Sequence, residues 1–321
     1  MGARHALNIL NKTPRAELVA AFSPDGKELQ GLEAVVIGTA TSVHAEETLQ
    51  ALEKDLHVLC EKPLSTSVKI CQDVVDAAAR KPHLKAMCGF SRRFDESYQD
   101  VARKIAEGAI GRPTVIRSQT CDRQHPDPGE HHDFFVQYAA WSGGVFVDMS
   151  VHNIDLTLWY FGSNVVPKSI SANGVVAILP GLKQYKDYDN AVDIVEFWDG
   201  RIAHYYASRM MTHGQEDVTE IIGTDGKLNV NLNPQKNIVN IYSRAGITRE
   251  VPGHHWGRFE PGFVKEANEF TAACLDDTSV PLEFQNAVKA VQIGAWLQEA
   301  LVSGKQIRFD ESGKRIDRAN L

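Results

Sequence analysis

Residues 34–63 read AVVIGTATSVHAEETLQALEKDLHVLCEKP, and this stretch decides the fold of the first part of the chain. Two short apolar runs, Ala34–Gly38 and His57–Cys60, enclose a helical pattern at Val43–Lys54. Apolar runs with few charges are typical of strands that are buried on both faces of a parallel sheet. The order strand, helix, strand therefore predicts a doubly wound α/β domain.

The same alternation continues on both sides of this stretch, so we expect a dinucleotide-binding (Rossmann-like) domain over residues 1–90. A further helix then leads into the second part of the chain. The additional predicted elements are strands at Leu18–Phe22 and Lys85–Gly89 and helices at Gly2–Asn11, Ser67–Arg80 and Asp95–Glu107.

The second part of the chain, residues 91–321, follows a different pattern. Consecutive strands without helices between them predict an α+β domain with a large, mainly antiparallel open sheet. Two helices, Gly262–Asp276 and Phe284–Ser303, are expected to finish the chain and to pack back on the first domain. The other predicted elements are a helix at Val147–Phe161 and strands at Thr114–Cys121, Ser169–Ile178, Ala191–Trp198, Arg201–Arg209, Val218–Gly223, Lys227–Val230 and Ile238–Tyr242.

The composition excludes several classes of protein. The 321 residues are 43% hydrophobic and 23% charged, with a formal net charge of −7, so a nucleic-acid-binding surface is not expected. No apolar run reaches the roughly 18 residues of a membrane span, and no signal-peptide core is visible. Five cysteines without close pairs favour reduced thiols, so we expect a cytoplasmic protein.

The start of the predicted Rossmann-like domain is incomplete. A dinucleotide-binding domain opens with a strand and then G-x-G-x-x-G, whereas here Gly2 corresponds only to the last of these glycines. Only about ten residues follow Phe22 before the next strand, although a crossover needs a dozen or more. Either the sequence lacks segments that the encoded protein has, or the protein has lost tight dinucleotide binding.

Ser23 bears on the choice of cofactor. It stands where the acidic residue that binds the ribose hydroxyls is expected, about 20 residues after the fingerprint. A serine with Lys27 nearby can accept a 2′-phosphate that a carboxylate would repel. The sequence therefore favours NADP slightly over NAD, with a simple turn at Ser23 as the alternative.

Glu61, Lys62 and Pro63 form the first motif that carries chemistry. They end a predicted buried strand, and ligands of open α/β sheets bind beyond the carboxyl ends of the strands. An ammonium group there can stabilise a developing alkoxide, and a cis bond at Pro63 would direct Lys62. The alternative is a strand end with solvated charges.

The second motif follows the glycine pair Gly143–Gly144. On a helix, Asp148 and His152 are four residues apart and share a face, and Asp155 lies one turn further on. A carboxylate beside an imidazole fixes the orientation of the ring and favours its charged form, which suits a general base that takes a hydroxyl proton. The alternative is a helix start with an acidic residue in its first turn.

Together, Glu-Lys-Pro at a strand end and Gly-Gly-x-x-x-Asp-x-x-x-His-x-x-Asp resemble the Gfo/Idh/MocA family of oxidoreductases. The resemblance runs through nearly the whole chain. It includes Thr39–His44 as the loop beside the nicotinamide, Gly89–Asp95 as the domain-linking segment and Glu220–Gly226 as a sheet hairpin. It implies a Rossmann domain, a second domain with a large open sheet, and a homodimer or homotetramer formed through that sheet.

The resemblance also implies roles for single residues. Lys62 matches the catalytic lysine, Asp148 the acid and His152 the general base. The implied cofactor-binding residues are Gly2, Ser23, Thr39, Thr41, His44, Glu61, Lys62 and Pro63, and the implied substrate-binding residues are Arg93, His131, His132, Asp148 and His152.

The sequence thus favours an NAD(P)-dependent dehydrogenase that moves a hydride to or from a carbinol carbon of a sugar, inositol or related polyol. A non-catalytic relative, an oligomeric binding or regulatory protein, is the alternative. A zinc-dependent alcohol dehydrogenase is a third interpretation, because Cys121–His125 and Glu130–Asp133 are rich in ligand-type residues. Their spacing matches no compact zinc pattern, so no metal is expected.

Overall fold

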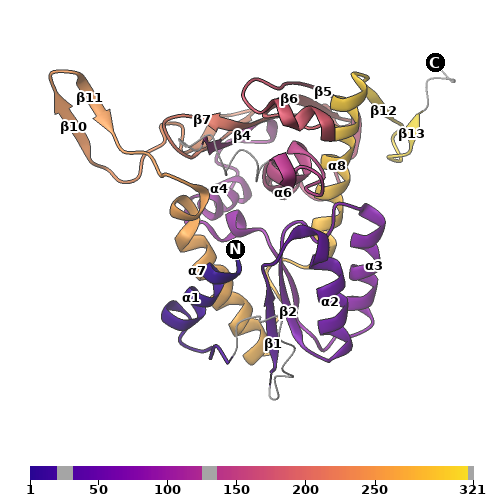
Figure 1. Cartoon of the computed structure of the whole chain (residues 1–321). Helices are drawn as coiled ribbons and strands as arrows, with labels where there is room; N and C mark the ends of the chain where they lie inside the picture. Colours follow the sequence, from indigo (N-terminus) through magenta and orange to yellow (C-terminus); the bar gives the residue numbers. More distant parts are fainter. Residues whose placement is uncertain (20–31, 125–135, 317–321) are drawn as a thin grey trace. The chain divides into compact units, whose positions relative to one another are not determined.

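The computed structural model describes residues 1–19, 32–124 and 136–316 (Figure 1). The chain divides into two compact units, which are described separately. Unit 1 comprises Met1–Glu96 and Glu260–Gln292, and unit 2 comprises Ser97–Phe259 and Ile293–Leu321. The long helices α7 (His255–Leu275) and α8 (Phe284–Ser303) contribute residues to both.

Unit 1 is built on a three-stranded parallel sheet in the order β1-β2-β3. The central strand is buried along its length, with Val58, Leu59 and Cys60 at most 1% exposed. In Figure 1, α1 and α7 flank one side of this sheet and α2 and α3 the other. The elements are α1 (Gly2–Lys12), β1 (Ala34–Ile37), η1 (Thr41–Val43), α2 (His44–Glu53), β2 (His57–Glu61), α3 (Val68–Ala79), β3 (Ala86–Gly89) and η2 (Ser91–Phe94).

This arrangement confirms the α/β prediction for the first part of the chain, because helices cover both faces of a parallel sheet. The helix α3 begins directly after Ser67. The Ser67 side chain caps the helix, because it accepts a hydrogen bond from the Ile70 N–H. The predicted strand Leu18–Phe22 is different: Leu18 and Val19 are not in a strand, and the rest of it lies outside the described residues.

Unit 2 contains an eight-stranded sheet in the order β13-β12-β5-β6-β7-β4-β8-β9. All its neighbouring strands run antiparallel except β4 and β7, which pair in parallel. This confirms the predicted large, mainly antiparallel open sheet, in which the neighbours β4 and β7 form the parallel pair. The strands are β4 (Pro113–Arg123), β5 (Pro167–Val175), β6 (Asn190–Phe197), β7 (Ile202–Met211), β8 (Glu216–Gly223), β9 (Lys227–Val230), β12 (Ile307–Phe309) and β13 (Arg315–Ile316).

The helix α6 (Val151–Phe161) fills one face of this sheet, and most of its side chains are buried. Gly162 ends it with a φ of 93°, a backbone conformation that glycine adopts readily. The opposite face carries exposed apolar side chains, among them Val192, at 41%, and Ile194, at 52%. The expected contact between copies of the chain through this sheet stays a prediction.

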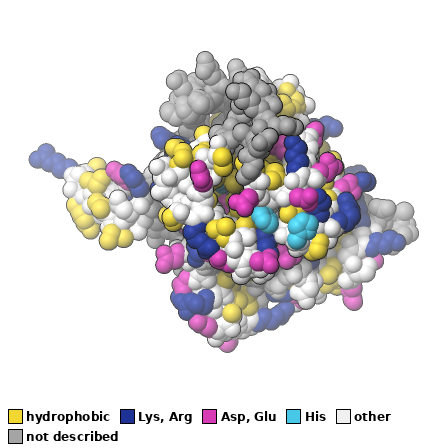
Figure 2. Space-filling model, turned by 90° about the horizontal axis from the view of Figure 1, so that it is seen from below, with side chains coloured by type: hydrophobic (Ala, Val, Ile, Leu, Met, Phe, Trp, Pro, Cys, Tyr) yellow, Lys and Arg dark blue, Asp and Glu magenta, His cyan; other side chains and the backbone are white. Residues whose placement is uncertain are grey.

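Several strands escaped the sequence analysis. The predicted strand Ile238–Tyr242 is one half of a hairpin, β10 (Asn240–Ser243) with β11 (Gly246–Arg249), and β12 and β13 follow the last helix. All eight hairpin residues are exposed, and Figure 2 shows hydrophobic side chains on this projecting arm and interspersed charges elsewhere on the displayed face. The helix α7 begins at His255 rather than at the predicted Gly262. It contains Pro261, a residue type that usually interrupts a helix.

A separate short helix, α4 (Glu96–Ala106), precedes β4 and agrees closely with the predicted Asp95–Glu107. The remaining 3-10 turn is η4 (Pro180–Tyr185), and a π-helical turn, η3 (Phe146–Ser150), leads into α6. Within the described ranges, each helix is too short or too polar to span a bilayer.

Candidate active site

Three loops of unit 1 follow the carboxyl ends of β1, β2 and β3, and because these strands are parallel and adjacent, the loops lie at one edge of the sheet. We call it the carboxyl edge. Thr39, Thr41 and His44 follow β1, Lys62 follows β2, and Arg93 follows β3. The edge therefore collects predicted cofactor and substrate residues where ligands of open α/β sheets bind.

His44 joins two of these loops. Its side chain is only 2% exposed, with Nδ1 2.8 Å from the backbone oxygen of Pro63 and Nε2 3.3 Å from that of Thr39. The Lys62–Pro63 peptide bond is cis, as the sequence suggested. Lys62 itself is half-buried at the end of β2. The imidazole thus links the backbone of the loops after β1 and β2, and its ring nitrogens are not presented to solvent.

The first turn of α1 lies against the end of β1. The Gly2 N–H donates to the Gly38 backbone oxygen at 3.1 Å, and a Cβ added at Gly38 would lie 3.0 Å from the Gly2 nitrogen. A side chain at position 38 would therefore require the start of α1 to shift by a few tenths of an ångström. The helix start beside a strand end is the arrangement in which phosphate groups of dinucleotides bind. Nearby, the exposed Thr39 hydroxyl donates to Glu47 at 2.6 Å.

Glu61 belongs to a buried cluster of unit 1 that we call the His5 cluster, formed by His5, Glu61 and Glu266. His5 Nε2 lies 2.8 Å from Glu61 Oε1, and the backbone N–H of Lys62 donates to Glu61 Oε2 at 3.2 Å. Burial raises the pKa of Glu61, but the hydrogen bond and charge of His5, together with the charges of Lys62 and His44, outweigh it, so the pKa lies below its ordinary value. The Glu61 contact with the cofactor ribose stays a prediction.

Glu266 is the third member of the His5 cluster and is completely buried. Among the described residues its two carboxylate oxygens have no hydrogen-bond partner. Burial and the negative charge of Glu61 raise the pKa of Glu266 well above its ordinary value. One ligand-type atom from each of the three residues lies within 4.8 Å of the others, and the raised pKa of Glu266 favours its neutral form over a second buried charge beside Glu61.

In unit 2, the segment that carries Asp148 begins with the glycine pair. Gly144 has a φ of 87°, and a Cβ there would lie 2.2 Å from the Gln298 side chain. Three side chains accept hydrogen bonds from the first N–H groups of the turn. They are Ser142 Oγ, 3.2 Å from Gly144 N, Asp187 Oδ1, 2.8 Å from Val145 N, and Gln298 Oε1, 3.5 Å from Phe146 N.

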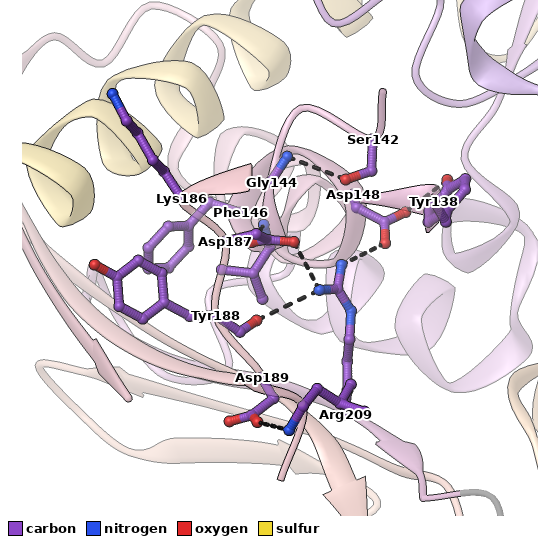
Figure 3. Close-up of polar contacts among 12 residues, drawn as sticks. Tyr138, Ser142, Gly144, Phe146, Asp148, Lys186, Asp187, Tyr188, Asp189 and Arg209 are labelled. Carbon is purple, nitrogen blue, oxygen red and sulfur yellow. Dashed lines mark hydrogen bonds and ion pairs between the residues drawn. The ribbon is translucent and has the colours of Figure 1, made fainter. Parts of the chain in front are cut away.

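Figure 3 shows that the Asp148 carboxylate is held from two sides. Its Oδ1 accepts from the Tyr138 hydroxyl at 3.2 Å, and its Oδ2 accepts from Arg209 Nη2 at 3.0 Å. The Asp148 side chain is 16% exposed, whereas that of Arg209 is 3% exposed. A partly exposed carboxylate with both oxygens bound is well oriented for a ligand that approaches from solvent.

Arg209 also binds Asp187, through Nη1 and Oδ2 at 2.9 Å. Its guanidinium therefore bridges two carboxylates, and we call these three residues the Arg209 bridge. Burial lowers the pKa of Arg209, but the charges of Asp187 and Asp148 outweigh it, so the pKa lies above its ordinary value. The bridge is thus a permanent cation between two acidic side chains.

His152 lies half-buried in the first turn of α6. The helix predicted for Asp148 and His152 is present, but Asp148 sits in the π-helical turn η3, which is a correction to the regular α-helical spacing that was assumed. Such π turns are rare and occur frequently at functional sites. The orientation of His152 by Asp148 stays a prediction.

The remaining predicted residues divide as follows. Lys62 and Arg93 belong to unit 1, and Asp148 and His152 to unit 2, so their joint action stays a prediction. Ser23, His131 and His132 lie outside the described residues, as does most of the zinc-ligand-rich loop, whose Cys121 is buried in β4.

The sequence analysis missed Tyr138, Asp187, Arg209, His5 and Glu266. A signal for Arg209 existed, because it is the one arginine within the apolar run of β7. A charge in a buried strand is rare unless it is paired. Its partners come from distant segments, so no spacing rule could have identified them.

Two family models match the chain in succession. Residues 27–90 match the model described as "Oxidoreductase family, NAD-binding Rossmann fold", and residues 98–229 match "GFO/IDH/MocA C-terminal domain". The chain belongs to the Gfo/Idh/MocA family. This confirms the resemblance inferred from the Lys62 and Asp148 motifs.

Members of this family with inositol in their names are similar to the chain over nearly its whole length. Scyllo-inositol 2-dehydrogenase (NAD(+)) of Bacillus subtilis is 28% identical, covering 97% of this chain and 94% of the relative. A crystal structure of scyllo-inositol dehydrogenase from Lactobacillus casei with NAD(H) and scyllo-inositol is also 28% identical, with a TM-score of 0.88 and coverage of 96% and 95%.

A third similar protein, myo-inositol 2-dehydrogenase from Lactobacillus plantarum, is 25% identical in its crystal structure, with a TM-score of 0.89 and coverage of 96% of both chains. The chain is therefore an inositol dehydrogenase-like member of the Gfo/Idh/MocA family. The matching first domain is described as NAD-binding, so the slight preference for NADP inferred from Ser23 has no support.

Proposed function

We propose that the protein is an NAD-dependent dehydrogenase that oxidises one ring CH–OH of an inositol or a closely related cyclic polyol to a ketone. The observation that carries this proposal is the similarity, over 96% of the chain, to a structure containing NAD(H) and scyllo-inositol. The carboxyl edge supports it, because the close contact of Gly2 with Gly38 suits a helix start that binds a dinucleotide.

In the proposed reaction, Gly2, Thr39, Thr41, His44 and Pro63 line the cofactor site, and NAD⁺ supplies the hydride acceptor when bound. Lys62 donates a hydrogen bond to the substrate oxygen and stabilises the negative charge that develops on it. His152 takes the hydroxyl proton as the C–H bond breaks, and Asp148 orients the imidazole. The substrate loses one hydride and one proton, so the products are ketone, NADH and H⁺.

The first experiment separates cofactor binding from catalysis. NADH and NADPH are titrated against the protein by fluorescence, and a panel of inositol stereoisomers and aldoses is then assayed for NADH formation. We expect tighter binding of NADH and turnover with at least one inositol. If neither dinucleotide binds, the protein is a non-catalytic family member and the proposal is wrong.

The second experiment addresses the base. His152→Ala should lower kcat about 10²–10⁴-fold, because a positioned general base contributes that much, while the affinity for NADH stays unchanged. His213→Ala is the matched control, since His213 is an exposed histidine of the same unit that pairs with Glu216. Unchanged turnover in His152→Ala would remove this residue from the mechanism.

A further inference from the structure

The Arg209 bridge differs in accessibility from one end to the other. The side chain of Asp187 is 1% exposed and that of Arg209 is 3% exposed, so neither can meet a substrate. Asp148 is 16% exposed and is the end of the bridge that opens to solvent. Asp187 and Arg209 can therefore influence a reaction only through Asp148.

The buried end of the bridge is attached to the backbone that carries Asp148. Asp187 Oδ2 binds Arg209, while its Oδ1 accepts from the N–H of Val145, three residues before Asp148. One carboxylate therefore holds both the start of the π-helical turn and the guanidinium that holds the Asp148 side chain. The position and the orientation of Asp148 depend on the same group.

The guanidinium has little freedom to turn. Arg209 Nη1 donates to Asp187 and, at 3.4 Å, to the backbone oxygen of Tyr188, and Nη2 donates to Asp148. The Arg209 backbone N–H donates to the Asp189 backbone oxygen at 2.8 Å. Asp189 is fixed in turn, because its carboxylate accepts from the N–H groups of Ala177, Ile178 and Leu179.

From this geometry we infer that Arg209 and Asp187 are positioning residues, which hold Asp148 in the orientation that the proposed dehydrogenation requires. The inference rests on the proposed function and extends it to two residues that touch neither substrate nor cofactor. A planar guanidinium can bind two carboxylates at fixed angles, which the single ammonium of a lysine cannot reproduce.

The kinetic test uses Arg209→Lys, Arg209→Met and Asp187→Asn in the full chain. Arg209→Met should lower kcat and kcat/KM together by about 10²-fold, the loss expected when a catalytic group moves by about 1 Å. Arg209→Lys should lower kcat and kcat/KM less than Arg209→Met does, because lysine keeps the positive charge. The dissociation constant for NADH should stay within about twofold, because a misplaced Asp148 affects the reacting centre rather than dinucleotide binding.

The matched control is Arg201→Met. Arg201 lies in the turn between β6 and β7, binds Asp199 at 2.8 Å and the Phe161 backbone oxygen at 2.6 Å, and has no hydrogen bond or ion pair with Asp148 among the described residues. It should lower the melting temperature without lowering kcat per folded enzyme. Equal loss of kcat in Arg201→Met and Arg209→Met would reduce Arg209 to a structural residue and overturn the inference.

A crystal structure of Arg209→Met keeps the inference testable if no substrate is turned over. We expect the Asp148 carboxylate to leave its place beside Tyr138 and the turn at Val145 to shift. An Asp148 carboxylate that stays in place would overturn the positioning role, whereas an inactive wild type would contradict only the proposed function.

Discussion

The His5 cluster of unit 1 and the Arg209 bridge of unit 2 each contain two carboxyl groups, but they balance the charge in different ways. In the bridge, one guanidinium binds both carboxylates. In the His5 cluster, Glu61 has His5 as partner and Glu266 has no hydrogen-bond partner among the described residues. The first arrangement pairs both carboxyl groups with one cation, whereas in the second burial and the negative charge of Glu61 raise the pKa of Glu266.

The difference teaches which buried carboxyl groups can take part in chemistry. A carboxylate held by a buried cation keeps a fixed orientation and charge, which a catalytic site can use. A carboxyl that is fully buried and protonated cannot exchange its proton readily with a substrate. Asp148 is held by Arg209, whereas burial and the charge of Glu61 raise the pKa of Glu266, so ligand-type composition alone does not identify a site.

The largest effect should come from removing the cation of the bridge. Arg209→Met leaves Asp187 and Asp148 without their shared partner, and breaking a buried ion pair in this way costs about 3–5 kcal/mol. The free energy of unfolding from urea titration measures it. Adding Asp187→Asn should recover part of the loss, because one unpaired charge is then gone. No recovery in the double variant would mean that the bridge acts through packing rather than charge.

The bridge also shows where sequence reasoning reached its limit. Parallel strands at Ala34–Gly38 and His57–Cys60 and the helix before Gly162 followed from local patterns, because burial on both faces and helix capping are set by neighbouring residues. The pairing of Arg209 with Asp187 and Asp148 is set by the topology of the sheet. Sequence spacing contains no such information.

The same limit explains the remaining misses. The parallel pairing of β4 with β7 joins segments separated by two other strands in sequence, β5 and β6, so the rule that consecutive strands are antiparallel did not apply to it. His5 and Glu266 meet Glu61 from opposite ends of the chain. By contrast, Lys62 and Asp148 were predicted as site residues from sequence motifs. Such motifs are shared by the members of the family and do not depend on which strands pair.

An intermediate effect should come from removing the partner of Glu61. His5→Leu leaves a buried carboxylate without its hydrogen bond, which costs about 1.5–3 kcal/mol at neutral pH. The pKa of Glu61 in the folded protein lies below its ordinary value of 4.5, so the stability it contributes is present above that pH and is lost as the pH falls through the folded pKa. The His5→Leu loss should therefore shrink in acid.

His5→Gln is the matched variant for this experiment, because glutamine keeps a donor near Glu61. It should lose less stability than His5→Leu when both are compared by urea unfolding at neutral pH and in acid. An equal loss in the two variants at both pH values would show that the ring of His5, which contacts Phe263 edge-on at 5.8 Å between centroids, stabilises the unit by packing.

The last effect concerns Glu266 and has the opposite sign. Its pKa in the folded protein is raised, so above about pH 4.5 the folded state keeps a proton that the unfolded state releases. Wild-type stability should then fall as the pH rises from there, by at most about 1.4 kcal/mol per pH unit, until the pH passes the folded pKa. Glu266→Gln removes this decline and should gain on the wild type with rising pH.

The comparison of unfolding curves across pH isolates Glu266, because His5 and Glu61, the two ionisable groups it faces in the cluster, are the same in both proteins. Glu269→Gln is the control on the same helix, since Glu269 is partly exposed and lies beside Lys265. Its curve should run parallel to that of the wild type. If the Glu266→Gln curve is also parallel, Glu266 is ionised in the folded protein. A cation would then have to balance its charge, and the contrast with the Arg209 bridge would disappear.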